Sequence, residues 1–182
     1  MIDLLTPNGF IVEVPENQYE DLTPKFDVNL EVDAGTKYYK DNGYVIFSNC
    51  VSSKDCEQIK SLWEKSIKPY KGKIYRQTTA KAEKNIFNKN YWVMNPVLNL
   101  QSLNPNLFGD FRNVVEKKIF SNILICKAFR ALLGEKPKIV QSMYFEGNSA
   151  TWEHQDSYYL DSEKIGEMSA GWVALEEIKA EA

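Results

Sequence analysis

The sequence predicts one α+β domain in which helices pack outside a β-core. Its 182 residues are enough for a single domain with a sizeable hydrophobic core. Helical patterns fill the first part of the chain and strand patterns gather near its end, an order typical of α+β proteins. We therefore expect residues 1–135 to be mostly helical or irregular, with a few strands. Residues 136–182 are expected to hold the first strands of the β-core.

Before residue 50, the sequence predicts two strands and one short helix. Apolar and polar residues alternate over Phe10–Val14, and Pro15 stops the strand that this alternation predicts. Thr36–Asp41 is predicted to be a short helix, with Gly43 at its exit. Tyr44–Phe47 is then expected to be a strand.

Three longer helices are predicted in the middle of the chain. The first begins at Ser52, because Ser52 and Asp55 resemble a capping box, and it ends at Pro69. Ile74–Pro105 is irregular and carries several aromatic residues, and loops of this kind often form lids. Two further helices carry apolar residues at helical spacing. The positions are Phe108, Phe111, Val115 and Ile119 in one helix, and Ile123, Leu124, Ala128 and Leu132 in the next, before Gly134.

The expected β-core follows Lys136. Ile139–Phe145 is predicted to be a strand, and a turn at Gly147 directs the chain towards Trp152–Asp156. Gly171–Ile178 is the last predicted strand. Only three or so strands are expected in this region, whereas a closed barrel or jelly roll needs about eight. A barrel built from this chain is therefore expected to be incomplete.

Composition excludes several classes of protein. The apolar and charged fractions, 43% and 26%, are ordinary for a globular protein. A net charge of −3 argues against a nucleic-acid binder, and no apolar run is long enough to span a bilayer. The first residues lack the pattern of a signal peptide. Three scattered cysteines form no metal or disulfide pattern, so we expect a cytoplasmic protein with free thiols.

Charge is unevenly distributed along the chain. Residues 1–33 contain eight acidic residues and one lysine, whereas eight basic residues face one glutamate over residues 65–89. The basic residues are Lys65, Lys68, Lys71, Lys73, Arg76, Lys81, Lys84 and Lys89. Two interpretations stay open: a solvated loop surface, or a wall that attracts a carboxylate-bearing ligand into a cleft.

The candidate chemistry lies at His154-Gln155-Asp156. Side chains two residues apart on an extended segment lie on one face, so His154 and Asp156 can bind one cation. Imidazole and carboxylate together suit divalent iron. His154 is the only histidine, so a two-histidine site cannot be built from this chain alone. A surface histidine beside a solvated aspartate is the alternative, and a hydrolase is disfavoured because no nucleophile-elbow motif is present.

Three stretches together resemble the phytanoyl-CoA dioxygenase family. They are Tyr38–Phe47 with the helix that follows, Gln141–Phe145 with His154-Gln155-Asp156, and Gly171–Ile178. The resemblance extends from about Tyr38 to the C-terminus. It implies an iron(II)- and 2-oxoglutarate-dependent oxygenase on a double-stranded β-helix, a jelly-roll or cupin-like core with helices outside. Such an enzyme uses O2, converts 2-oxoglutarate to succinate and CO2, and usually hydroxylates a small organic substrate.

The same resemblance implies roles for single residues. His154 and Asp156 would ligate iron, and Trp172 would line the co-substrate pocket. The presence of Asp156 favours hydroxylation over halogenation, because related iron halogenases lack this carboxylate.

Alternate residues of the strand Ile139–Phe145 are the next candidates. Met143 is expected near the co-substrate, and Gln141 and Phe145 near the substrate. Ordinary core packing is the alternative for Met143 and Phe145, whereas an inward amide at Gln141 would need a polar partner. Trp152 is either part of the substrate site, as a lid anchor, or a packing residue.

The chain departs from the family pattern in two ways. The family's second histidine is missing, and so is the later arginine that clamps 2-oxoglutarate, since Arg76, Arg112 and Arg130 all precede His154. We expect the chain to be an N-terminal portion of a family member. The alternative is a truncated or degenerate homologue that acts as a binding or structural protein. Taken alone, the chain is expected to bind iron weakly and to turn over nothing.

Overall fold

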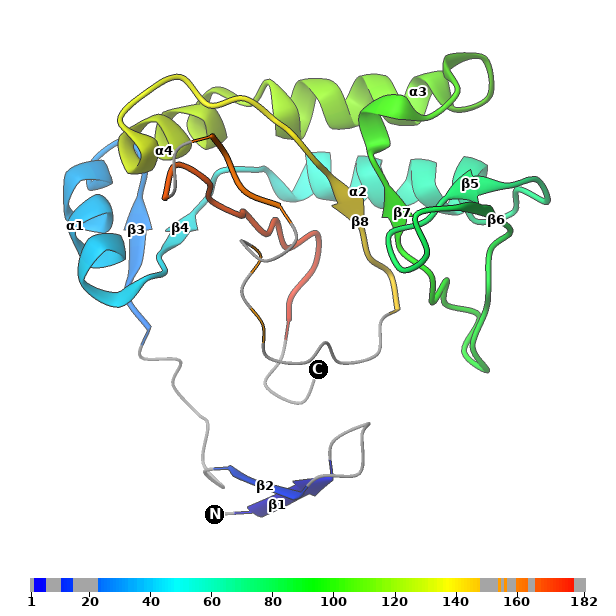
Figure 1. Ribbon diagram of the computed structural model, residues 1–182, viewed down its shortest axis with the longest axis horizontal. Helices are drawn as coiled ribbons and strands as arrows, with labels where there is room; N and C mark the ends of the chain where they lie inside the picture. The colour runs from blue at the N-terminus through cyan, green and yellow to red at the C-terminus, as the bar shows by residue number, and fades with distance from the viewer. Residues whose placement is uncertain are drawn as a thin grey trace.

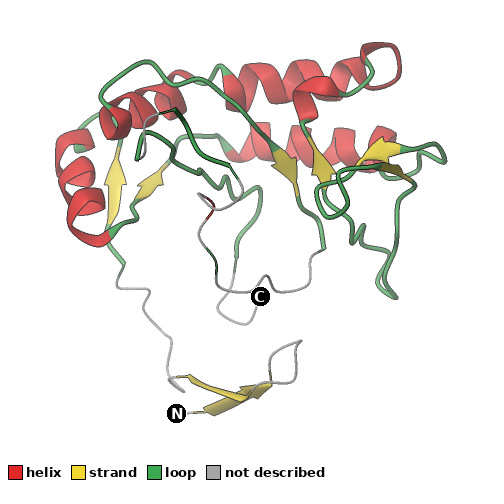
Figure 2. Cartoon of the chain, viewed as in Figure 1, coloured by secondary structure: helices red, strands yellow, loops and turns green. Residues whose placement is uncertain are grey.

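The computed structural model describes residues 2–5, 11–14, 23–147, 154, 156, 160–163 and 166–178. Its helices lie together along one side, and the short strands and loops of residues 74–98, 160–163 and 166–178 lie beneath them in the view of Figure 1. Figure 2 shows how much of the remaining chain is loop. The mixture of helices and small sheets agrees with the predicted α+β class, and the described residues form no closed barrel.

Four α-helices are described, and two of them continue into wider π-helical turns. Helix α1 packs on α4, and α2 packs on α3. The bounds are Val32–Asn42 for α1, Ser53–Leu62 for α2 with the π-helix η1 at Trp63–Ile67, Pro105–Val115 for α3 with the π-helix η3 at Glu116–Phe120, and Ile123–Leu133 for α4. A short 3₁₀ helix, η2, covers Leu100–Ser102.

Local signals set the helix ends. The Ser52 hydroxyl accepts a hydrogen bond from the Asp55 backbone N–H at 3.1 Å, which confirms Ser52 as the N-cap of α2. Gly43 and Gly134 end α1 and α4 with φ near 80° and 78°, a left-handed conformation that glycine adopts without strain. The predicted helix Thr36–Asp41 is confirmed but begins earlier, at Val32.

The strands of the described residues form four two-stranded sheets. Strands β3 and β4 pair in parallel, and the other three pairs are antiparallel. The bounds are Ile2–Leu5 for β1 and Ile11–Val14 for β2, Lys25–Asp27 for β3 and Ile46–Ser48 for β4, Ile74–Tyr75 for β5 and Ala82–Glu83 for β6, and Val97–Leu98 for β7 and Met143–Tyr144 for β8. The loop predicted over Ile74–Pro105 therefore contains three very short strands and η2.

The hydrophobic core lies between α2, α3 and β8. Ile59, Trp63 and Ile67 line one face of α2 and η1, and Phe111 of α3 packs against them. Tyr144 of β8 stacks on Trp63, with ring centroids 4.0 Å apart and an interplanar angle of 16°. Burial of each large apolar side chain stabilises the fold by roughly 1.5–3 kcal/mol. The core therefore joins the strand that precedes the candidate site to the helical layer.

Two strand predictions need correction. The prediction of a strand at Gly171–Ile178 is wrong: residues 171–178 run as an irregular segment. The strand predicted over Ile139–Phe145 is reduced to Met143–Tyr144. Both differences have one physical cause, because a strand exists only where a neighbour completes its hydrogen bonds. Val97 and Leu98 of β7 pair with β8, whereas no described strand pairs with residues 171–178.

Candidate functional site

His154 and Asp156 lie in direct contact. His154 Nε2 is 3.0 Å from Asp156 Oδ1, and the two side chains are 37% and 60% exposed. The imidazole and the carboxylate therefore converge at the protein surface, where solvent and small molecules reach both. Gln155 between them is outside the described residues.

The donor set suits a divalent cation in part. One imidazole nitrogen and one carboxylate oxygen are ligands that iron(II) accepts. Within the described part of the chain, no third His, Cys, Asp or Glu joins them to make a cluster of three. The sequence holds one histidine, so a second imidazole does not come from these 182 residues. The role of His154 and Asp156 as metal ligands stays a prediction.

Strand β8 and the two residues before it present two different faces. Tyr144 is buried in the core, and the Ser142 hydroxyl accepts a hydrogen bond from Leu100 N at 2.9 Å. Gln141 and Met143, on the alternate positions, are exposed. The prediction separated these two faces because side chains alternate along a strand. Gln141 faces solvent, so the expected polar partner for an inward amide has no counterpart at this position.

Phe145 and Trp172 form an aromatic pair beside this open face. Their rings stack with centroids 5.0 Å apart and an interplanar angle of 22°. Phe145 is half-buried, whereas Trp172 is 80% exposed. Sequence analysis placed Trp172 near the co-substrate and Phe145 near the substrate, and the two residues, 27 positions apart in the chain, are in contact. Their rings leave an apolar surface open to solvent. Trp152, the remaining candidate, lies outside the described residues.

The segment that carries Trp172 is held against the helices by contacts of its own. The Tyr39 hydroxyl of α1 is 3.1 Å from the Ser169 hydroxyl. A side chain at Gly171 would place its Cβ 2.6 Å from Phe129 Cζ of α4, so a larger residue would require the Phe129 ring to shift. These contacts place Trp172 next to Phe145 without any strand pairing.

The comparison with protein families decides the assignment. A family model described as phytanoyl-CoA dioxygenase (PhyH) matches residues 39–182. The chain belongs to the PhyH family. No curated protein and no solved structure matches the chain. The family consists of dioxygenase-type enzymes, and the match covers every site residue that the sequence predicted.

The basic stretch of this PhyH chain divides into structural and exposed residues. Arg76 is fully buried and donates to the Asn95 carbonyl at 3.0 Å, and burial lowers the pKa of its guanidinium. Lys68 is 7% exposed and bonds Glu64 and Glu146. The other six cations are exposed: Lys65, Lys71, Lys73, Lys81, Lys84 and Lys89. Sequence analysis did not single out the Lys68–Glu146 pair, because charge counts do not show which lysine is buried.

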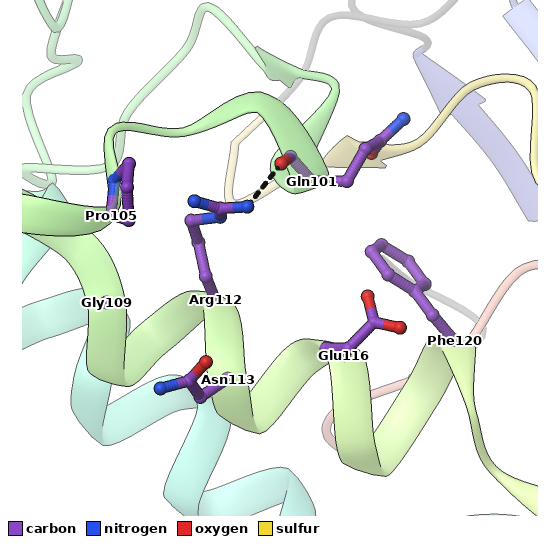
Figure 3. A pocket seen from close by; sticks show the side chains of 7 residues that line it. All are labelled: Gln101, Pro105, Gly109, Arg112, Asn113, Glu116 and Phe120. Atoms are coloured by element: carbon purple, nitrogen blue, oxygen red, sulfur yellow. Dashed lines mark hydrogen bonds between the residues drawn. The ribbon is translucent and has the colours of Figure 1, made fainter.

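Two shallow hollows of the PhyH chain lie away from His154 and Asp156. The first, of about 340 Å³, lies along α3 and η3, and Arg112 in it donates to the Gln101 carbonyl at 2.8 Å (Figure 3). The second, of about 390 Å³, lies between the start of α2 and residues 174–177. Neither hollow contains a residue that the sequence predicted for the site.

Among the helices that the structure describes, none combines the length and the apolar character that crossing a bilayer requires.

Proposed function

We propose that this protein is a non-haem iron(II)- and 2-oxoglutarate-dependent dioxygenase that oxidises a small organic molecule. The observation that carries the proposal is the 3.0 Å contact between His154 Nε2 and Asp156 Oδ1, in a chain that belongs to the PhyH family. When bound, the iron would activate O2 and drive oxidative decarboxylation of 2-oxoglutarate to succinate and CO2.

His154 and Asp156 would hold the metal through the atoms that now face one another. Both groups must be deprotonated to act as ligands, so protons compete with the metal for the site. An ion between them would replace the hydrogen bond of the metal-free pair. Because both side chains are exposed, the metal can enter from solvent without rearrangement of the core.

The exposed apolar residues Met143 and Trp172, with Phe145 stacked on Trp172, support a small-molecule site. Met143, Phe145 and Trp172 would form an apolar wall for the co-substrate and the organic substrate. Apolar walls exclude water and leave few polar groups to set the orientation of a ligand. We further propose that β8, which pairs with β7, begins the β-core of residues 136–182, on a double-stranded β-helix of the family type.

The exposed lysines of residues 65–89 favour an anionic group on the substrate. Lys65 lies in η1, two lysines lie between η1 and β5, and the other three lie next to β6 or after it. A field of one sign draws oppositely charged molecules towards a site. The lysines are Lys65, Lys71, Lys73, Lys81, Lys84 and Lys89. Equal turnover of cationic and anionic substrates in a screen would contradict this part of the proposal.

Metal binding at His154 is the first test. The chain has a single histidine, so its imidazole NMR signals need no further assignment. Anaerobic titration with Fe(II) should broaden these signals, and Asp156→Asn should weaken the apparent affinity by on the order of tenfold or more. Asp161→Asn, which changes another exposed carboxylate nearby, should leave the affinity unchanged. Unchanged His154 signals at millimolar Fe(II) would overturn the proposal.

Turnover of 2-oxoglutarate is the second test. The chain taken alone is expected to release no succinate, so the assay uses a form of the protein that also carries the family's second histidine and later arginine. Succinate release by that form that requires Fe(II), and that disappears in His154→Ala, would support the dioxygenase. Iron binding by that form without succinate release would favour the alternative, a homologue of the family that binds ligands without catalysing a reaction. The lone histidine is the observation that keeps this alternative in view.

A further inference from the structure

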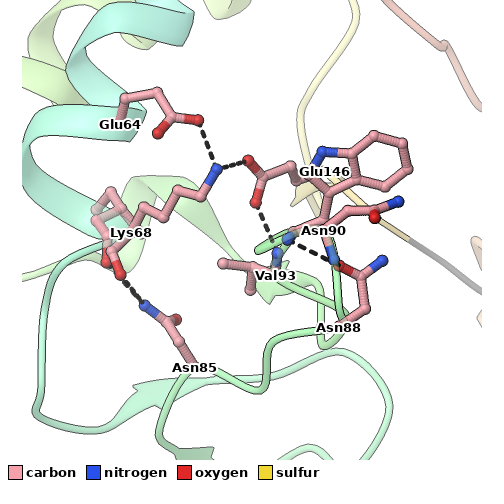
Figure 4. Close-up of polar contacts among 9 residues, drawn as sticks. Glu64, Lys68, Asn85, Asn88, Asn90, Val93 and Glu146 are labelled. Carbon is pink, nitrogen blue, oxygen red and sulfur yellow. Dashed lines mark hydrogen bonds and ion pairs between the residues drawn. The ribbon is translucent and has the colours of Figure 1, made fainter.

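A buried lysine lies between two carboxylates where the chain leaves β8. Lys68 Nζ is 2.7 Å from Glu64 Oε1 and 2.5 Å from Glu146 Oε1 (Figure 4). Glu64 is on the same helical segment as Lys68, whereas Glu146 comes from the residues that directly follow β8. The Lys68 and Glu146 side chains are 9% and 14% exposed, so their ion pair is largely shielded from water.

Glu146 uses both of its carboxylate oxygens. Oε1 bonds Lys68, and Oε2 accepts the Val93 N–H at 2.7 Å. The next residue, Gly147, donates its N–H to the Val93 carbonyl at 3.1 Å. Val93 is therefore held at both of its backbone polar groups by two consecutive residues. This joins the exit of β8 to the loop of residues 74–98.

Side chains of residues 92–94 pack closely against Gly147. A Cβ added at Gly147 would lie 2.6 Å from Met94 Sδ and 3.1 Å from Trp92 Cβ, whereas the Val93 carbonyl oxygen would lie 3.6 Å away. A larger residue at this position would therefore require the Met94 side chain to move.

The backbone at Lys68 is also fixed by hydrogen bonds. Asn85 donates its amide to the carbonyls of Ile67 and Lys68, both at 2.9 Å. The Arg76 guanidinium in turn donates to the Asn85 side-chain oxygen. Hydrogen bonds therefore fix both the backbone and the side chain of Lys68. Through its ion pair with Glu146, Lys68 connects the end of η1 to the residues that follow β8.

The electrostatics favour a charged pair. Burial by itself would lower the pKa of Lys68, but the hydrogen bonds from Glu146 and Glu64 outweigh burial and raise it. A partly buried ion pair contributes little net stability, because the cost of desolvation offsets the Coulomb attraction. Such a pair does contribute a fixed geometry when every polar group is satisfied. The Lys68–Glu146 ion pair therefore contributes more to the position of the residues after β8 than to the free energy of unfolding.

Glu146 lies eight residues before His154 in the chain. We propose that Lys68 and Glu146 are positioning residues, which fix the exit of β8 and so determine where His154 and Asp156 stand. The metal role of that corner rests on the proposed function, whereas the positioning itself does not.

The His154 imidazole signals of the metal-free chain provide the test. Lys68→Met and Glu146→Gln should shift or split these signals by more than their linewidth, because Glu146 loses the ion pair that fixes the residues directly after β8. Lys68→Arg, which keeps the charge, should restore signals close to those of the original protein. Amide exchange at Val93 and Gly147 should become at least about tenfold faster in the two damaging variants, the ratio that loss of a charged hydrogen bond predicts.

Two controls separate positioning from general stability. Glu64→Gln removes the other carboxylate from the same lysine without touching the β8 exit. Lys118→Met removes the 2.9 Å ion pair with Asp55 elsewhere in the helical layer. Both should lower Tm without moving the His154 signals. Each variant is measured well below its own Tm, and Glu146→Asp replaces Glu146→Gln if the latter does not fold.

The possible outcomes are distinct. His154 signals that stay in place in Lys68→Met and Glu146→Gln, or that move equally in the controls, would overturn the positioning role. Failure of Fe(II) to broaden the His154 signals of the original chain would overturn the proposed function and leave the positioning result intact.

Discussion

The phenol ring of Tyr144 stacks on the indole of Trp63, with centroids 4.0 Å apart. Tyr144 belongs to β8 and Trp63 to the first turn of η1, so one aromatic contact joins the strand of the candidate site to the helical layer. Both side chains are buried, at 9% and 1% exposure. Stacked aromatic pairs contribute about 0.5–1.5 kcal/mol beyond the area that they bury.

Tyr144→Ala should therefore lower the free energy of unfolding by about 3–5 kcal/mol, the range for removal of a buried aromatic ring. Met143→Ala, its neighbour on the exposed face of β8, should cost less than about 1 kcal/mol. Urea denaturation followed by tryptophan fluorescence measures both. Equal losses in the two variants would show that β8 does not separate a core face from an open face.

Gly171→Ala should displace the segment that carries Trp172. The new Cβ would lie 2.6 Å from Phe129 Cζ, and such overpacking costs about 1–3 kcal/mol. The matched control is Gly109→Ala in α3, where an added Cβ meets nothing within 4 Å. It should stabilise the protein by roughly 0.5–1 kcal/mol, because alanine is the better helix former. Thermal unfolding of both variants checks the opposite signs.

Asn122→Ala should be the most costly change at a helix start. The Asn122 side-chain oxygen accepts N–H bonds from Leu124 and Ile125, and its amide donates to the carbonyls of Cys50 and Lys118. Loss of an N-cap costs about 0.5–2 kcal/mol, and the two extra bonds place this variant at or above the upper end. Asn104→Ala, at the start of α3, removes the one hydrogen bond that the Asn104 side chain accepts among the described residues, from Asn106 N–H. Chemical denaturation should rank Asn122→Ala as the less stable, and the reverse order would contradict this view of the cap.

Stability should depend on the ionisation of Asp55. Hydrogen bonds from Lys118 and Ser52 lower the pKa of Asp55 in the folded protein. The stabilising contribution is therefore complete above the unfolded value, about 3.9, and disappears as the pH falls through the lower folded value. Asp55→Asn should have a lower Tm than the original protein at pH 6, and the two should converge near pH 2. A constant difference across this range would exclude the linkage.

The helix predictions from sequence were accurate where the signals were local. Ser52 caps α2, and Gly43 and Gly134 end α1 and α4, because each signal depends on hydrogen bonds within a few residues. Apolar spacing also identified the buried positions Phe108 and Phe111 of α3. These features follow from backbone chemistry and helical periodicity, which a single sequence contains in full.

The strand predictions depended on partners that one segment does not reveal. Residues 171–178 have the composition of a strand, but the structure holds them by the Gly171–Phe129 contact and the Phe145–Trp172 stack. β8 kept only the two residues that β7 pairs. A strand is stable only with a neighbour, so composition alone does not determine its length.

The candidate site shows the same division. The spacing of His154 and Asp156 predicted that their side chains lie close together, and His154 Nε2 is 3.0 Å from Asp156 Oδ1. The extended backbone assumed in that prediction is not seen at Asp156, which has 3₁₀-helical structure. The pairing of Lys68 with Glu146 spans 78 positions, and nothing local distinguishes Lys68 from the exposed lysines around it. Only the folded chain decides this pair, because burial selects which charges must find a partner and packing selects which partner is within reach.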